Sequence, residues 1–343
     1  MTTIVLFGGR SDERHVSVAT AQNVARAFGS PLCWFWSPDG AVHDVAPPEL
    51  LAHQRPFEMD YVPSRPALWP DLEQALDTLP VEEPVFFLAL HGGEGEDGTV
   101  QRMMEQRRIA FTGSGADASE LAFDKGRAKE VVRRHVRVAE SRIAWEAQEI
   151  ATITGEMLDR HDKVVLKPLA GGSSRGLFFA ESGRECDSIV REASRARVPY
   201  LIEQFISGRE LTVAVVDMEG EPVALPVLEI ETDPGREFDY EGKYLGKGTR
   251  EICPANISEK IRDDAQATAV RAHLALGCEG YSRTDVIASP QGVYFLELNT
   301  LPGLTSSSLV PQQLREAGIG FHDFLDRQLE LAKRRAATGV LQK

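Results

Sequence analysis

Cysteine is scarce in this chain. Four occur in 343 residues, at positions 33, 186, 253 and 278, and none belongs to a C-x-x-C pair. This spacing excludes a disulfide framework and a zinc motif, and it indicates reduced thiols that pack as small hydrophobic side chains. Long apolar runs are also missing: none approaches the roughly 18 residues of a membrane-spanning helix, and the N-terminus lacks the segments of a signal peptide. These absences predict a cytoplasmic protein without a membrane partner.

Positive charge is in deficit. Lysine and arginine number 38 against 52 aspartates and glutamates, so the formal net charge is −14. Such an acidic chain is disfavoured for non-specific binding to nucleic acid or to anionic membranes, although a local site can still bind an anion. With 42% hydrophobic and 26% charged residues, the composition is typical of a globular protein. Because 343 residues exceed what one hydrophobic core usually serves, we expect two or three domains.

The order of apolar segments predicts an N-terminal α/β unit followed by two mixed units. The run 4–7 ends at a glycine pair and precedes helical spacing over 16–28, and the run 85–90 is typical of a buried parallel strand. Several prolines predict loops within 33–84. We therefore divide the chain into an N-terminal domain of residues 1–113, a central domain of residues 114–203 and a C-terminal domain of residues 204–343.

The segment KPLAGGSSRG, residues 167–176, has the composition of a phosphate-binding loop in an unusual order. The common phosphate loop reads G-x-x-x-x-G-K-[ST] and opens a helix, whereas here Lys167 precedes the glycines and serines. Strand-like runs flank the segment at 164–166 and 177–179. The segment is therefore expected to connect two strands and to close over a triphosphate.

Residues 281–300 predict a β-hairpin with a defined register. Pro290-Gln291-Gly292 suits a three-residue loop that ends in a left-handed glycine. If Ser289 closes against Val293, Asp285 faces Glu297 across the two strands.

Arg283 and Asn299 also face each other in this register, on the same side as the two carboxylates. Carboxylate and amide oxygens suit Mg²⁺, which commonly takes one or two carboxylates plus substrate phosphates. A cross-strand salt bridge with Arg283 on a solvated face explains the same spacing equally well. A β-bulge would shift the register and separate these residues.

Two further carboxylates, Glu203 and Glu210, lie in the segment LIEQFISGREL, residues 201–211. Together with the lysine-led loop and the oxygen-rich patch, they favour a nucleoside triphosphate bound between strands and not at a helix N-terminus.

Ten short segments occur in a particular order along nearly the whole chain. They are GGRSDERHVS (8–17), HGGEGEDGT (91–99), FTGSG (111–115), DK (124–125), KPLAGGSSRG (167–176), IEQFISGRE (202–210), FDYEGKYL (238–245), CPA (253–255), GYSRTDV (280–286) and LELNTLPGLTSSSLVP (296–311). In this order they resemble the D-alanine–D-alanine ligases of the ATP-grasp superfamily. The resemblance implies a fold of class α/β and α+β with three domains, in which an N-terminal parallel α/β domain precedes two α+β domains that sandwich ATP.

By position, the resemblance implies a nucleotide site and a metal site. The nucleotide would be held by Lys125, Lys167 and the loop at Ser174 on the phosphates, Lys243 on the γ-phosphate, Glu203 and the backbone at Ile206 on adenine, and Glu210 on the ribose. Two Mg²⁺ or Mn²⁺ ions would bind Asp285, Glu297 and Asn299, with Glu297 between them.

The resemblance also implies the ligation of two D-alanine molecules through an acyl phosphate, for peptidoglycan synthesis. The substrates would be bound by Glu13 and His91 at the first ammonium, Arg283 and the Gly303 N–H at the oxyanion, and Ser308 and the Leu309 N–H at the second carboxylate, while Glu13, Ser173 and Tyr244 would form a hydrogen-bonded set. The loop that carries Tyr244 would act as a lid. Family members are typically homodimers, so we expect a homodimer on this ground alone.

Five positions depart from the family pattern: His15, Arg102, Arg175, Gln204 and Thr284. They remove none of the implied roles, but they leave open a ligase for other amino or hydroxy acids. A catalytically silent nucleotide-binding homologue is the other alternative. Taken singly, several candidates also have ordinary explanations, such as Glu13 as an acid near a helix start and His91 as a buried structural histidine.

Overall fold

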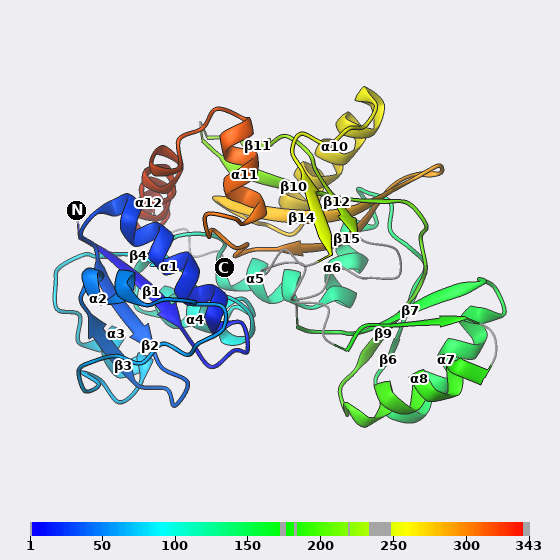
Figure 1. The fold of residues 1–343 in the computed structure, drawn as a ribbon, viewed down its shortest axis with the longest axis horizontal. Coiled ribbons are helices and arrows are strands. Elements are labelled where there is room, and N and C mark those ends of the chain that lie inside the picture. The colour runs from blue at the N-terminus through cyan, green and yellow to red at the C-terminus, as the bar shows by residue number, and fades with distance from the viewer. Residues whose placement is uncertain (1, 172–175, 182–183, 219, 233–247, 339–343) are drawn as a thin grey trace.

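The computed structural model describes residues 2–171, 176–181, 184–218, 220–232 and 248–338. Within these ranges the chain forms three β-sheets, each built from a different stretch of sequence and covered by helices (Figure 1). The N-terminal sheet is largely parallel and the other two are antiparallel, so the expected combination of α/β and α+β units is confirmed. Across the described residues, no helix has both the length and the hydrophobicity to cross a membrane.

The N-terminal sheet has five strands in the order β3-β2-β1-β4-β5. They are β1 (Thr3–Gly8), β2 (Leu32–Trp36), β3 (Val42–Val45), β4 (Val85–Leu88) and β5 (Ala110–Phe111). All are parallel except β3, which pairs antiparallel with β2 at one edge. The helices α1 (Arg14–Phe28) and α4 (Thr99–Gln106) each connect two parallel strands.

The proline-rich stretch 33–84 is more regular than its sequence indicates. Besides β3 it contains two short helices, α2 (Pro47–Ala52) and α3 (Leu72–Asp77). Two prolines begin α2 instead of preventing it, because the first N–H groups of a helix have no intrahelical acceptor and proline loses nothing there. The prediction of loops was wrong at these positions.

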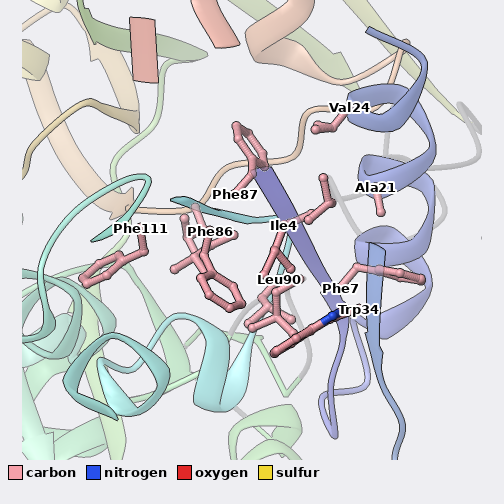
Figure 2. Close-up of a cluster of buried hydrophobic side chains, with 14 of the residues drawn as sticks. Ile4, Phe7, Ala21, Val24, Trp34, Phe86, Phe87, Leu90 and Phe111 are labelled. Atoms are coloured by element: carbon pink, nitrogen blue, oxygen red, sulfur yellow. The ribbon is translucent and has the colours of Figure 1, made fainter. Parts of the chain in front are cut away.

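Large apolar side chains fill the space around the N-terminal sheet (Figure 2). Ile4 and Phe7 of β1, Trp34 of β2 and Phe86 of β4 are all buried there. The helix α12 (Phe321–Thr338) packs against β4, β5 and α1 (Figure 1). A helix from the C-terminal end of the described chain therefore forms part of the hydrophobic core around the N-terminal sheet.

The central sheet has four antiparallel strands in the order β6-β9-β7-β8. They are β6 (Ser141–Ala144), β7 (Lys163–Pro168), β8 (Phe178–Glu181) and β9 (Tyr200–Gln204). The helices α7 (Ala147–Leu158) and α8 (Arg184–Arg195) pack on one face of this sheet. The strands β7 and β8, on either side of the described ends of the segment 167–176, pair directly, so this segment connects two strands as predicted.

The C-terminal sheet has six antiparallel strands, in the order β13-β12-β10-β14-β15 with β11 on β10. They are β10 (Arg209–Asp217), β11 (Pro222–Ala224), β12 (Leu228–Thr232), β13 (Thr249–Ile252), β14 (Tyr281–Ser289) and β15 (Gly292–Asn299). The helix α10 (Glu259–Ala275) covers one face, and α11 (Leu309–Glu316) packs against β10.

Two helices that precede the central sheet in sequence pack against the C-terminal sheet. They are α5 (Ala116–Phe123) and α6 (Lys125–Val132), and their buried side chains form a cluster with α10 and β15. Two helices that precede the central sheet in sequence thus form part of the hydrophobic core of the C-terminal sheet. The domain boundaries 1–113, 114–203 and 204–343 stay a prediction.

The hairpin of β14 and β15 reaches the predicted pairing by an unexpected route. Ser289 pairs with Gly292, so the turn has two residues and not the predicted three, and the register near the turn differs from the predicted one. A β-bulge between Asp285 and Val286 adds one residue on β15 and compensates for the shorter turn. Beyond the bulge Asp285 pairs with Glu297, as predicted.

We expect His273 to make the fold sensitive to acid. Its imidazole is buried on α10, and Nδ1 lies 2.8 Å from Ser282 Oγ of β14. Burial lowers the pKa of His273 to about 4, so the unfolded chain binds a proton more readily below about pH 6.5. Between about pH 7 and about pH 4.5 the free energy of unfolding should therefore fall. In a His273→Asn variant, whose amide can still form a hydrogen bond, this fall should be smaller by about 2 to 3 kcal/mol.

Urea unfolding of both proteins at the two pH values measures this difference. The comparison cancels the contribution of the carboxylates, which titrate in both proteins. Equal losses of unfolding free energy in the two proteins would show that His273 is not the acid-sensitive group.

Candidate active site

A cleft of about 1220 Å³ lies between the central and C-terminal sheets. A smaller cavity of about 70 Å³ adjoins it and extends to the segments that follow β1 and β4 of the N-terminal sheet. The predicted site residues that line these two spaces are Glu13, His91, Lys125, Lys167, Glu203, Ile206, Glu210, Arg283, Asp285, Glu297, Asn299, Gly303, Ser308 and Leu309. Predicted site residues from positions as far apart as 13 and 309 thus lie in one region of the fold.

Four predicted site residues fall outside the described residues: Ser173, Ser174, Lys243 and Tyr244. Their roles stay predictions. Of the five departures from the family pattern, Arg175 also falls outside, and Gln204 lines the cleft. His15 pairs with Asp60 at 2.9 Å, and Arg102 pairs with Glu120 at 2.8 Å.

Lys125 enters the cleft from the first turn of α6. The carboxylate of Asp124 caps this helix by accepting hydrogen bonds from the backbone N–H groups of Gly126 and Arg127 at 3.0 Å. The Lys125 ammonium donates to the Gly171 carbonyl and lies 3.6 Å from Glu297 Oε2. A capped helix start therefore directs one cation towards the carboxylates of the C-terminal sheet.

Glu203 of β9 lies between two lysines. One carboxylate oxygen pairs with Lys129 of α6 and the other with Lys167 of β7, and all three side chains are buried. Burial acts to raise the pKa of Glu203, but the two ammonium groups outweigh it and hold that pKa below its usual value. Burial lowers the pKa of Lys129 to about 8, against the opposing effect of Glu203.

Sequence reasoning missed Lys129. The available signal was its spacing: it follows Lys125 by four residues, which places both lysines on one face of a helix. Nothing in the sequence shows that this lysine is buried, because its partner Glu203 comes from β9, far along the chain.

The carboxylates of the C-terminal sheet form the patch that the register predicts. Asp285 pairs with Glu297, and Arg283 pairs with Asn299. The Arg283 guanidinium donates two hydrogen bonds to the Asp285 carboxylate, at 2.9 and 2.8 Å, and Thr212 Oγ1 donates a third at 2.5 Å. The alternative of a salt bridge is therefore partly realised: Arg283 pairs with Asp285 of its own strand, where both side chains are largely buried and not on a solvated face.

The patch has the chemistry of a magnesium site. Two carboxylates and an amide oxygen are hard ligands, and Mg²⁺ bound with a nucleotide takes its remaining ligands from phosphates and water. Asn299 Nδ2 is buried and has no hydrogen-bond partner among the described residues. The described residues contain no cluster of three or more His, Cys, Asp or Glu that could hold a metal, so a cation here would depend on the amide and on ligand oxygens.

The smaller cavity joins the N-terminal domain to the C-terminal sheet. Glu13 is the N-cap residue of α1, and its side chain makes no capping hydrogen bond. His91 Nδ1 lies 3.0 Å from the Leu301 carbonyl, and Nε2 lies 2.8 Å from Thr20 Oγ1. A carbonyl only accepts, so Nδ1 carries the proton and Nε2 accepts from the threonine hydroxyl. Both ring nitrogens of His91 therefore have hydrogen-bond partners within the protein, as in a buried structural histidine.

Glu96 is a second residue that sequence reasoning missed. It lines the smaller cavity with Glu13, and its Oε1 lies 3.8 Å from His91 Nδ1. Burial raises the pKa of Glu96, the nearby His91 opposes this rise and Glu13 adds to it. The signal in the sequence was its place in the glycine-rich segment 91–99.

Ser308 and Leu309 lie at the start of α11. Ser308 is its N-cap residue, and the Ser308 hydroxyl accepts from the Thr305 N–H at 3.1 Å. The first N–H groups of a helix have no intrahelical acceptor, so the Leu309 N–H is suited to an anionic group. A Cβ on Gly303 would lie 2.9 Å from Ser308 Oγ, so glycine lets the two loop segments approach this closely.

Comparison with known proteins identifies the family. Residues 2–114 match the model described as D-ala D-ala ligase N-terminus, and residues 142–330 match the one described as D-ala D-ala ligase C-terminus. The chain belongs to the D-alanine–D-alanine ligase family. The D-alanine–D-alanine ligase of Halalkalibacterium halodurans is 34% identical over 339 residues, which cover 97% of this chain and 99% of that protein. The D-alanine–D-alanine ligase of Herminiimonas arsenicoxydans is 36% identical over 339 residues, with 96% and 90% covered.

Solved structures of this family share the fold. The VanG D-Ala:D-Ser ligase of Enterococcus faecalis superimposes with a TM-score of 0.80 at 28% identity, over 96% of this chain and 99% of that one. The D-alanine–D-alanine ligase of Coxiella burnetii gives a TM-score of 0.81 at 23% identity, over 98% and 95%. These likenesses confirm the expected ATP-grasp architecture.

Replacing Glu297 by Gln tests the cation site. The change removes one of two carboxylates, so Mn²⁺ binding in the presence of ATP should weaken by about tenfold or more. Electron paramagnetic resonance of free Mn²⁺ during a titration measures this affinity. Glu330→Gln, on the exposed face of α12, is the matched control and should bind Mn²⁺ as the unchanged protein does. Equal affinities in both variants would refute the assignment of Glu297.

Proposed function

We propose that the protein uses ATP to join two D-alanine molecules into D-alanyl-D-alanine, as a supplier of peptidoglycan precursor synthesis. The observation that carries the proposal is the meeting of Lys125 and Lys167 with Asp285, Glu297 and Asn299 around the cleft and the smaller cavity that adjoins it. Family membership and the names of the relatives support the same reaction. Use of ATP and synthesis of a small precursor agree with a cytoplasmic location.

The nucleotide is proposed to lie along the cleft. Lys125 and Lys167 would neutralise the phosphates, Glu203 and the backbone at Ile206 would contact adenine, and Glu210 would contact the ribose. The support is that all five residues line this one space. The loop at Ser174 and Lys243 belong to the same proposal.

Asp285, Glu297 and Asn299 would hold two Mg²⁺ ions, or Mn²⁺ in their place. Bound there, the ions supply charge neutralisation and orientation for the transferring phosphoryl group. The ion pair with Arg283 orients the Asp285 carboxylate. This side chain therefore loses less conformational entropy when a cation binds.

The proposed chemistry has two steps. A carboxylate oxygen of the first D-alanine attacks the γ-phosphorus of ATP, the bond to ADP breaks, and an acyl phosphate forms. The amine of the second D-alanine then attacks the acyl carbon and loses a proton, and inorganic phosphate leaves from the tetrahedral intermediate. Phosphorylation is needed because a bare carboxylate oxygen is a poor leaving group.

Residues of the smaller cavity are proposed to orient the two amino acids. Glu13 and His91, which both line this cavity, would anchor the ammonium of the first D-alanine. Arg283 and the Gly303 N–H would stabilise the oxyanion of the tetrahedral intermediate. The carboxylate of the second D-alanine would bind Ser308 and the Leu309 N–H, at the start of α11 where helix N–H groups favour an anion.

Exclusion of water belongs to the same proposal, because acyl phosphates hydrolyse. A hydrogen-bonded set of Glu13, Ser173 and Tyr244 would connect the three domains, and the loop that carries Tyr244 would act as a lid over the site. A homodimer, expected from the resemblance alone, also stays a proposal.

The reaction is tested by incubating the purified protein with ATP, Mg²⁺ and D-alanine. Phosphate release and a dipeptide of D-alanine in mass spectrometry are the expected results. Parallel incubations that pair D-alanine with D-serine or D-lactate identify the second substrate. This comparison is needed because one of the similar structures is a D-Ala:D-Ser ligase. Binding of ATP without turnover of any pair would instead favour a catalytically silent homologue.

Replacing Arg283 by Lys tests the oxyanion role. Lysine keeps the charge but loses the planar fork that donates twice to Asp285. The turnover number should fall by about a hundredfold, while the dissociation constant of ATP changes by about threefold or less. Arg262→Lys, on the exposed surface of α10, is the control. A turnover number near that of the control would contradict the role.

A further inference from the structure

Glu203, Lys129 and Lys167 form a chain of charges that is only partly in contact with the cleft. Lys167 and Glu203 line the cleft. Lys129 is buried, with 3% of its side chain exposed, and it is absent from the described residues that line either space. Its ammonium reaches the carboxylate of Glu203 from the side of α6. Its direct contact with a residue of the cleft is therefore the ion pair with Glu203.

Lys167 has two possible partners. In this structure its ammonium pairs with Glu203, and an anion in the cleft would compete for the same ammonium. A buried carboxylate that loses its counter-ion is strongly destabilised. Lys167 would therefore be held back from a phosphate if it were the sole cation beside Glu203.

Lys129 removes this conflict. It contacts the carboxylate oxygen that Lys167 does not use, so Glu203 keeps a counter-ion when Lys167 moves. The helix that carries Lys129 is fixed at its start by the Asp124 cap and along its length by packing of Ala128 and Val132 into the core. Lys129 is thus anchored to Glu203 by the fold and not by a ligand.

We infer that Lys129 is a positioning residue, the permanent counter-ion of Glu203 that lets Lys167 exchange this carboxylate for a phosphate group of the nucleotide. The inference rests on the proposed function in one respect, which is that the nucleotide phosphates bind at Lys167. It assigns a role to a residue that touches no substrate, and it predicts an effect confined to the phosphate part of the ligand.

The test compares ATP with adenosine, which lacks the phosphates. In Lys129→Met, calorimetric titration should show ATP binding weakened by about tenfold or more and adenosine binding changed by about twofold or less. Lys129→Arg keeps the charge and should bind both ligands within about threefold of the unchanged protein. A merely structural role of Lys129 would weaken both ligands by the same factor, and this result would overturn the inference.

A double variant keeps the test decisive if Lys129→Met does not fold. In Lys129→Met combined with Glu203→Gln, no buried carboxylate remains to hold Lys167. The ratio of the two dissociation constants, adenosine over ATP, should then return to within about threefold of its original value, whatever the loss of the Glu203 carboxylate does to adenine binding. A ratio close to one in the folded double variant would overturn the inference. Failure of the unchanged protein to bind ATP would overturn the proposed function together with it.

Discussion

Ion pairs between side chains from different elements hold the charged surface of the cleft in place. Glu203 pairs with lysines from α6 and β7, and Lys125 approaches Glu297 of β15. Buried pairs of this kind add little to stability, because removing the charges from water costs about as much as their attraction returns. Their effect is on geometry: the cations and carboxylates of the cleft have defined positions before any ligand arrives.

Polar contacts of the loop 300–308 join the N-terminal part of the chain to the same site. Asn23 of α1 donates to the Leu304 carbonyl at 2.8 Å, and His91 bonds the Leu301 carbonyl. This loop runs from the end of β15 to Ser308, so it connects the carboxylate patch to the start of α11. Glu13 and Ser308 consequently line one small cavity although they lie near opposite ends of the sequence. Ligation of two amino acids requires such a meeting of two binding regions.

The β14–β15 hairpin shows how a correct prediction arose from an incorrect turn. A three-residue loop without a bulge and a two-residue loop with a bulge place Asp285 opposite Glu297 in the same way. The pattern of apolar and polar residues does not distinguish them, because it reports only which face each side chain occupies. The bulge that threatened the metal patch in principle preserves it here, and Leu296 and Glu297 both line the cleft.

The sequence by itself determined the order of strands and motifs, the family, and which carboxylates and lysines to examine, since these follow from local residue patterns. It did not identify Lys129 or Glu96, the engagement of both nitrogens of His91, or the packing of α5 and α6 on a sheet that is formed much later in the chain. These features depend on burial and on partners from distant segments. Only the tertiary structure decides them, because the environment of a charge is set by everything that packs around it and not by its neighbours along the chain.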